Sequence, residues 1–297
     1  MTPCSQAKAL LLAARPKTLP AAVCPVVAGS ALAWRMTHQF SWLLAICTLL
    51  STVCIQIATN YFNDAEDAAK GADTAARLGP VRATASGLVS RRTMMMAGLA
   101  AVLAAALFSI PLLHACGWPI LVIGIVSLLF SYGYTGGPWP LAYRGLGELF
   151  VMLFFGLVAV TGTVFVHTGQ WRVEGLLAGI QIGCLSTVLI AINNLRDISE
   201  DRRSGKRTLA VRFGVTVARW MIAVWCVLPF FAGLFWIKLG TLDAGNGMPI
   251  ATILFSTSIL AGIWRTAPSR EYNRFLVLAV FYLLFWTGLF TKACLKG

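Results

Sequence analysis

The chain has 297 residues, of which 58% are hydrophobic and only 12% are charged. Soluble domains carry roughly 25% charged residues, so this composition excludes an ordinary soluble protein and indicates an integral membrane protein. The formal net charge of +13 could suggest a nucleic-acid-binding protein. The basic side chains are instead spread over short segments between apolar stretches, so we expect no nucleic-acid partner.

Nine apolar stretches approach the length of about 20 residues that crosses a hydrocarbon core of roughly 30 Å. We expect helices at about 19–36, 41–62, 93–113, 118–135, 147–167, 174–195, 216–238, 249–265 and 274–293. The gaps between them are short. The sequence therefore predicts an all-α bundle of about nine transmembrane helices, forming a single domain over residues 1–297 embedded in membrane lipid.

The distribution of basic residues predicts the orientation of this bundle. With the N-terminus in the cytoplasm, nine helices place 19 of the 24 basic residues on the cytoplasmic side. An excess of Lys and Arg in cytoplasmic segments is the usual topological signal. We therefore expect an N-in, C-out protein of the cell (inner) membrane.

Two acidic clusters follow apolar stretches, at residues 60–67 and 193–201, and with Asp73 they hold seven of the 11 acidic residues. Positions three, four and seven apart share one face of a helix. Two faces of carboxylates and amides are therefore predicted, one with Asn60, Asp64 and Asp67 and the other with Asn193, Asp197 and Asp201. Glu66 and Glu200 lie off these faces, and we expect them to be solvated.

Hard oxygen ligands with room for a substrate phosphate are what Mg²⁺ prefers. Each acidic cluster is followed by a polar segment with glycine and cations, and a third Gly/Pro-rich segment spans residues 132–144. All three segments fall on the cytoplasmic side of the predicted topology. We therefore expect one composite Mg²⁺ and diphosphate site facing the cytoplasm. Glu148 is expected to begin a helix, where an acid suits the helix dipole, and a supporting role for it at the site stays open.

At these residues the chain resembles the UbiA superfamily of intramembrane prenyltransferases. Within it, the likeness is greatest to the branch that prenylates 1,4-dihydroxy-2-naphthoate in menaquinone biosynthesis. The matching segments cover nearly the whole chain and occur in order: Ala14–Pro20, Asn63–Asp67 with Lys70, Gly71 and Asp73, Arg77–Arg82, Tyr134–Pro138, Leu141–Gly145, Asn193–Asp201 and Gly205–Leu209. The third aspartate of the general NDxxDxxxD pattern would fall at position 71, where this chain has glycine, and Asp73 follows two residues later.

The resemblance implies Mg²⁺-dependent transfer of a polyprenyl group from polyprenyl diphosphate to 1,4-dihydroxy-2-naphthoate, with loss of diphosphate and CO₂. By position, it assigns Asp64, Asp67, Asp197 and Asp201 to the metal and diphosphate, with Asp73 as a further catalytic residue that positions or deprotonates the aromatic substrate. It implies that the diphosphate side of the site is completed by Asn60, Asn63, Asn194, Arg82, Arg144 and Lys206.

Three alternatives stay open at this point. Another aromatic acceptor, such as 4-hydroxybenzoate or homogentisate, would keep the chemistry, but Gly71 with Asp73 favours the naphthoate branch. A secondary transporter would carry its site near the bilayer midplane on broken helices, whereas these acidic residues sit at one surface. A lipid-binding scaffold would not need two metal-competent faces beside several cations.

Overall fold

The computed structural model describes residues 3–72, 78–80, 82–242 and 250–296, and all of their regular secondary structure is helical. The elements are α1 (Pro3–Ala13), η1 (Pro16–Thr18), α2 (Pro20–Thr37), α3 (Trp42–Ala69), α4 (Arg91–Cys116), α5 (Trp118–Gly133), η2 (Leu141–Arg144), α6 (Gly147–Val151), the π-helix η3 (Met152–Val158), α7 (Ala159–Thr168), α8 (Val173–Arg196), α9 (Ile198–Arg203), α10 (Leu209–Gly233), α11 (Phe235–Leu239), η4 (Ile250–Thr252), α13 (Ile253–Arg265) and α14 (Tyr272–Leu295). The predicted all-α class is therefore confirmed.

Within the described ranges, six helical segments are long and apolar enough to cross a membrane: α3, α4, α6 to α7, α8, α10 with α11, and α14. A seventh is counted if α1 with η1 and α2, which are bent by 50° at their junction, form one span. The remaining two apolar helices, α5 and α13, are shorter, at 16 and 13 residues. The multi-pass character is thus borne out, and the full set of nine spans stays a prediction.

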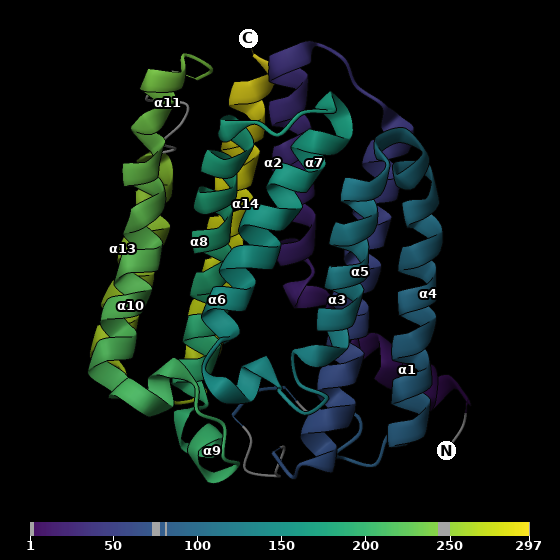
Figure 1. The fold of residues 1–297 in the computed structure, drawn as a ribbon. Coiled ribbons are helices and arrows are strands. Elements are labelled where there is room, and N and C mark those ends of the chain that lie inside the picture. The colour runs from purple at the N-terminus through teal and green to yellow at the C-terminus, as the bar shows by residue number, and fades with distance from the viewer. Residues whose placement is uncertain (1–2, 73–77, 81, 243–249, 297) are drawn as a thin grey trace.

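Helix α8 is the centre of the bundle. It packs against α2, α7, η3, α10 and α14. In its apolar 18-residue stretch 78% of the residues are buried, against 17% in the corresponding stretch of α4. The main hydrophobic core accordingly gathers α8 residues with those of α10 and α14. On the other side, α3 packs along α4 and α5, and Figure 1 shows this group standing beside the α8 group.

Both acidic clusters lie at the same end of the bundle. Helices α3 and α8 run in the same direction, and their C-terminal ends lie with α9 at the end opposite the C-terminus of the chain (Figure 1). Helix α3 continues to Ala69, beyond the expected end near residue 62, because its polar cluster is itself helical and largely buried. The cluster is therefore held on a rigid helix rather than in a loop.

Close backbone packing brings the α6–η3 segment against α8. A Cβ atom added to Gly156 would lie 2.5 Å from the carbonyl oxygen of Gly179 and 2.6 Å from the Cα of Gly183. Small residues spaced four apart allow membrane helices to approach this closely. This contact sets the height of α6, and with it Glu148, beside the C-terminal end of α8.

Candidate active site

Asp67 is the point at which three segments of the site meet. Its carboxylate is buried, with the residue 2% exposed. Tyr143, on η2, donates its hydroxyl to Oδ1 at 2.9 Å, and Lys206 donates its ammonium to Oδ2 at 3.0 Å. The guanidinium of Arg82 lies 3.5 Å from the same Oδ2. The structure therefore brings together the predicted residues Asp67, Arg82 and Lys206 with Tyr143 of the Gly/Pro-rich segment 132–144.

Lys206 also connects the two acidic clusters. Its backbone N–H donates to the carbonyl of Asp201 at 2.8 Å, while its side chain reaches Asp67 on the other helix. A single residue thus ties the end of α9 to the end of α3. The two acidic clusters are linked in this way across elements that are far apart in the sequence.

Two ammonium groups flank the ring of Tyr143. The Nζ atom of Lys70 lies 4.4 Å and that of Lys206 lies 5.0 Å from the ring centroid, and Lys70 also donates to the carbonyl of Thr135. Burial lowers the pKa of Lys70, although nearby carboxylates oppose the shift. With Arg82, these cations concentrate positive charge around Asp67 and Tyr143, and such charge favours phosphate anions.

The other predicted residues of the first cluster hold its surroundings in place. Asp64 accepts hydrogen bonds from the backbone N–H groups of Ala83 at 3.2 Å and Thr84 at 2.8 Å. This carboxylate therefore holds the segment that follows Arg82. Asn63 accepts a hydrogen bond from the hydroxyl of Thr135 at 2.6 Å.

Asn60 serves the N-terminal side of the site. Its amide donates to the carbonyl of Ala14 at 2.8 Å and accepts from Gln56 at 3.1 Å. It therefore joins α3 to the segment between α1 and η1.

In the second cluster, Asp197 is engaged by its neighbour Arg196. The guanidinium donates to both carboxylate oxygens, at 2.7 and 2.6 Å, and Arg196 also reaches Asn193 and Asn273, each at 2.7 Å. Arg196 is 2% exposed, so this is a buried, charge-compensated pair that anchors the end of α8 to α14. The spacing of residues along α8 does not indicate this role of Arg196.

The helical register of the second cluster survives the break between α8 and α9. The N–H of Asp197 donates to the carbonyl of Asn193 at 3.1 Å, and the N–H of Asp201 donates to that of Asp197 at 2.9 Å. Asn193, Asp197 and Asp201 therefore do share one face, as expected from their spacing.

The expectation that Glu66 and Glu200 are solvated was wrong. Glu66 is 6% exposed and forms an ion pair with Arg91 at 2.7 Å. Glu200 is 8% exposed, and its Oε1 is buried with no hydrogen-bond partner. Both carboxylates belong to the packed end of the bundle because neighbouring segments fold over the helix ends.

One predicted residue that the structure describes, Arg144, is not joined to the acidic clusters. Arg144 is exposed, and its guanidinium lies over the ring of Trp139 at 3.8 Å. Among the contacts of the described residues, none links the Arg144 side chain to an acidic group. Asp73 lies outside the described residues.

Asn194 leads to Glu148, whose supporting role at the site was left open, and to Tyr134, which lies in the predicted Gly/Pro-rich segment of the site. It donates its amide to Oε1 of Glu148 at 2.9 Å, and Tyr134 lies beside this pair, since a Cβ on Gly147 would be 3.1 Å from its hydroxyl. Burial raises the pKa of Tyr134, and the carboxylates of Glu148 and Asp67 raise it further. The position of Glu148 at a helix start, two residues before Phe150, carried no signal of this burial.

The fit of a divalent cation depends on the donor set. Four aspartates on two facing helix ends are hard oxygen donors of the kind that Mg²⁺ takes, and the buried, unpartnered oxygen of Glu200 adds another acceptor nearby. In the part of the chain that is described, no three His, Cys, Asp or Glu side chains gather closely enough to form a metal cluster. Asp67 is instead balanced by Lys206 and Arg82. The donor chemistry fits a metal that would arrive together with the anionic substrate.

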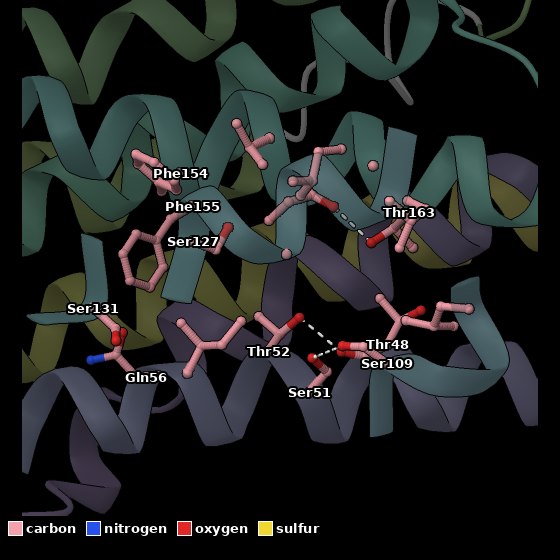
Figure 2. Close-up of a pocket in the computed structure, with 18 of the residues that line it drawn as sticks. Thr48, Ser51, Thr52, Gln56, Ser109, Ser127, Ser131, Phe154, Phe155 and Thr163 are labelled. Carbon is pink, nitrogen blue, oxygen red and sulfur yellow. Dashed lines mark hydrogen bonds between the residues drawn. The ribbon is translucent and has the colours of Figure 1, made fainter. Parts of the chain in front are cut away.

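An apolar groove leads away from the charged end, between α3, α4, α5 and the α6–α7 segment (Figure 2). Hydroxyl side chains line part of it, but several are bonded to their own helices: Thr48 donates to the carbonyl of Leu44 at 2.8 Å, and Thr52 donates to that of Thr48 at 2.8 Å. Such back-bonding removes their polarity from the wall. The groove is thus suited to a hydrocarbon chain. Gln56, Ser131 and Phe150 line it, and Gln56 donates a hydrogen bond to Asn60 of the first acidic cluster.

Comparison with known proteins identifies the family. The model of the UbiA prenyltransferase family matches residues 22–289. The chain belongs to the UbiA prenyltransferase family. It is an integral membrane prenyltransferase, and the resemblance drawn from its motifs is confirmed.

Curated relatives and solved structures agree with this assignment. The chain is 35% identical to a 1,4-dihydroxy-2-naphthoate octaprenyltransferase of Haemophilus influenzae over 78% of this chain and 76% of that protein. It is 34% identical to the protein of the same name from Mycobacterium tuberculosis, over 86% and 93%. Among solved structures, a UbiA homologue of Aeropyrum pernix has the same fold, with a TM-score of 0.68, 17% identity and coverage of 88% and 94%. A homologue of Archaeoglobus fulgidus solved with DMAPP and Mg²⁺ gives a TM-score of 0.62 at 13% identity, with coverage of 95% and 98%.

Proposed function

We propose that this protein transfers a polyprenyl group from polyprenyl diphosphate to 1,4-dihydroxy-2-naphthoate, with loss of CO₂, to give demethylmenaquinol. The observation that carries the proposal is the meeting of Asp67, Lys206, Arg82 and Tyr143 beside an apolar groove. A charged end beside an apolar channel matches a substrate with a diphosphate head and a hydrocarbon tail. The names of the curated relatives support the naphthoate as acceptor.

The cations of the site act on the leaving group. Lys206, Lys70 and Arg82 would neutralise the charge that develops on the diphosphate as the allylic C–O bond breaks. Asp64, Asp67, Asp197 and Asp201 would hold Mg²⁺, which would add Lewis-acid stabilisation of the same charge. These side chains would be kept in place by Asn60, Asn63 and Asn194. The guanidinium of Arg144 would have to leave the ring of Trp139 to bind the diphosphate.

The groove protects the reacting carbon. Its walls, including Phe150 and Phe154, exclude water, which would otherwise trap an allylic cation. Aromatic faces stabilise such a cation directly. Phe150 and Phe154, which line the groove, would supply such faces.

The whole chain would form one catalytic domain in the membrane. We propose nine spans with the N-terminus inside and the acidic clusters facing the cytoplasm, in the cell (inner) membrane. The supporting observations are the charge asymmetry of the sequence and the common location of both clusters at one end of the bundle. Asp73 keeps its proposed part in positioning or deprotonating the acceptor.

A prenyl-transfer assay on the purified protein in detergent tests the proposal. It would receive a long-chain prenyl diphosphate and either 1,4-dihydroxy-2-naphthoate or 4-hydroxybenzoate, with Mg²⁺ or with EDTA. We expect a prenylated, decarboxylated naphthoquinol only in the presence of Mg²⁺. Product from 4-hydroxybenzoate alone would overturn the acceptor, and product in EDTA would overturn the metal requirement.

A further inference from the structure

Glu148 is a carboxylate that the diphosphate chemistry leaves unused. It is 3% exposed. Its Oε1 accepts a hydrogen bond from Asn194 at 2.9 Å, whereas its Oε2 is buried and has no hydrogen-bond partner. Among the described residues, no Lys or Arg forms an ion pair with it. Ionisable groups buried in a membrane protein without such compensation mark functional positions.

The location of Glu148 is the junction between the groove and the charged cluster. Phe150, two residues later on the same helix, lines the groove together with Gln56 and Ser131, and Figure 2 labels the last two. Tyr134 stacks against Phe150 with a centroid distance of 4.9 Å. Its hydroxyl lies next to Gly147 at the start of α6.

An acceptor ring must reach this junction to react. The diphosphate is held by the cations around Asp67 and the prenyl tail extends into the groove, so the allylic carbon lies between them. A ring carbon attacking it brings the neighbouring ring hydroxyl to the wall formed by Tyr134 and Glu148. This inference rests on the proposed function.

We propose that Oε2 of Glu148 accepts the proton of the acceptor's ring hydroxyl as the new carbon–carbon bond forms. The ring carbon ortho to the hydroxyl bonds to C1 of the prenyl group, and the C1–O bond breaks with its electron pair leaving on the diphosphate. The O–H bonding pair becomes part of a new keto group, and the proton moves to Glu148. General bases placed in this way are a common device for activating a nucleophile.

The reaction is completed by loss of the acceptor's carboxylate as CO₂. Attack at the carbon that bears this carboxylate produces a β-keto carboxylate, which loses CO₂. The electrons of the broken C–C bond restore the aromatic ring, and the oxygen takes its proton back from Glu148. No proton is gained or lost overall, so Glu148 acts without any further reactant.

The test replaces Glu148 by glutamine. E148Q keeps an oxygen that can accept the hydrogen bond from Asn194 and keeps the volume of the side chain, but it cannot take up a proton. E174Q, in the first turn of α8, is the matched control because it makes the same chemical change in the first turn of another helix. Melting temperature in detergent and binding of prenyl diphosphate establish that each variant is folded.

We expect kcat of E148Q to fall by about 100-fold or more, as for loss of a general base, while E174Q keeps its activity. The KM for prenyl diphosphate should stay within about twofold, because an unchanged KM with a lower kcat indicates a group needed for the chemical step. The rate of E148Q should also rise with pH as the acceptor hydroxyl ionises in solution, which a purely structural residue would not produce.

The outcomes separate the two proposals. A wild-type protein that forms no prenylated naphthoquinol overturns the proposed function and this inference with it. If the wild-type protein forms this product and the kcat of folded E148Q is within about threefold of the wild-type kcat, only the role of Glu148 is overturned. If E148Q does not fold, E148D retains the carboxylate and should keep at least about ten times the activity of E148N; equal activities would also overturn the proposal.

Discussion

At the scale of single residues, Asp67 joins three segments of the site. A hydroxyl, an ammonium and a guanidinium from three different segments all reach its two carboxylate oxygens. Asp64, three residues earlier on the same helix, instead accepts two backbone N–H groups. Two aspartates of one motif therefore differ in their partners, and their replacement should differ in effect.

Replacing Asp67 by asparagine should lower kcat by about 10²–10³-fold, as expected when a group that stabilises transition-state charge is removed. The amide has no negative charge with which to organise Lys206 and Arg82 or to bind a cation. The measurement is steady-state prenyl transfer, with Glu271→Gln, an exposed acid at the start of α14, as control. Activity of Asp67→Asn close to that of Glu271→Gln would remove Asp67 from the mechanism.

Lys206 should act on the diphosphate rather than on the acceptor. Its ammonium lies 3.0 Å from Asp67, and its side chain is only 13% exposed. Loss of one charged hydrogen bond costs about 1.5–3 kcal/mol, so Lys206→Ala should raise the KM for prenyl diphosphate by roughly 10–100-fold. Lys238→Ala, on α11 at the opposite end of the bundle, is the matched control. An unchanged KM for the prenyl donor in Lys206→Ala would contradict this role.

At the scale of elements, the contact between η3 and α8 positions the wall of the site. Gly156 and Gly179 approach so closely that no side chain fits between their backbones. The π-helical turn of η3 lies in this contact, and such turns are frequent near functional sites. This packing holds the start of α6 beside Asn194, so a larger residue at Gly156 should displace Glu148 from its hydrogen bond with Asn194.

Gly156→Ala, which adds one methyl group, should lower the free energy of unfolding by about 1–3 kcal/mol, the usual effect of overpacking a tight contact. Gly288→Ala is the matched control, since a Cβ at Gly288 on α14 would meet no atom within 4 Å. Thermal unfolding in detergent measures both variants. Equal melting temperatures for Gly156→Ala and Gly288→Ala would show that η3 and α8 can move apart without loss of stability, which would contradict the prediction.

At the scale of the whole molecule, charge asymmetry and site location point to the same side of the membrane. The basic residues of the predicted cytoplasmic segments include Arg82 and Lys206, which also contact Asp67. The same cations can thus orient the chain and bind its anionic substrate. Attraction of positive segments to the cytoplasmic side is the established physical basis of topology.

This orientation can be tested with single exposed cysteines at the two ends of the bundle. Arg202→Cys lies on α9 at the site end, and Gln170→Cys lies in the turn between α7 and α8 at the other end. With a membrane-impermeant thiol reagent on intact cells, we expect Gln170→Cys to be labelled above the wild-type background and Arg202→Cys to be protected. Both should be labelled in detergent. The reverse pattern on cells would invert the proposed topology.

The sequence by itself determined the features that depend on local composition and spacing. Apolar stretches predicted the helices, and the spacing of Asn193, Asp197 and Asp201 predicted a shared face that the backbone hydrogen bonds confirm. The ordered motifs identified the family, which the match over residues 22–289 confirms. These properties are readable because they are set by neighbours within one or two helical turns.

Only the tertiary structure decided which of the polar residues meet. Lys206 reaches Asp67 across 139 positions of sequence, Arg144 turns to Trp139 instead, and Glu66 and Glu200 are buried rather than solvated. Glu148 emerged in the same way, because its burial depends on the glycine contact between η3 and α8 and on the amide of Asn194. Long-range packing and the need to satisfy buried polar groups set these partners, and neither is encoded in the spacing of residues along a single helix.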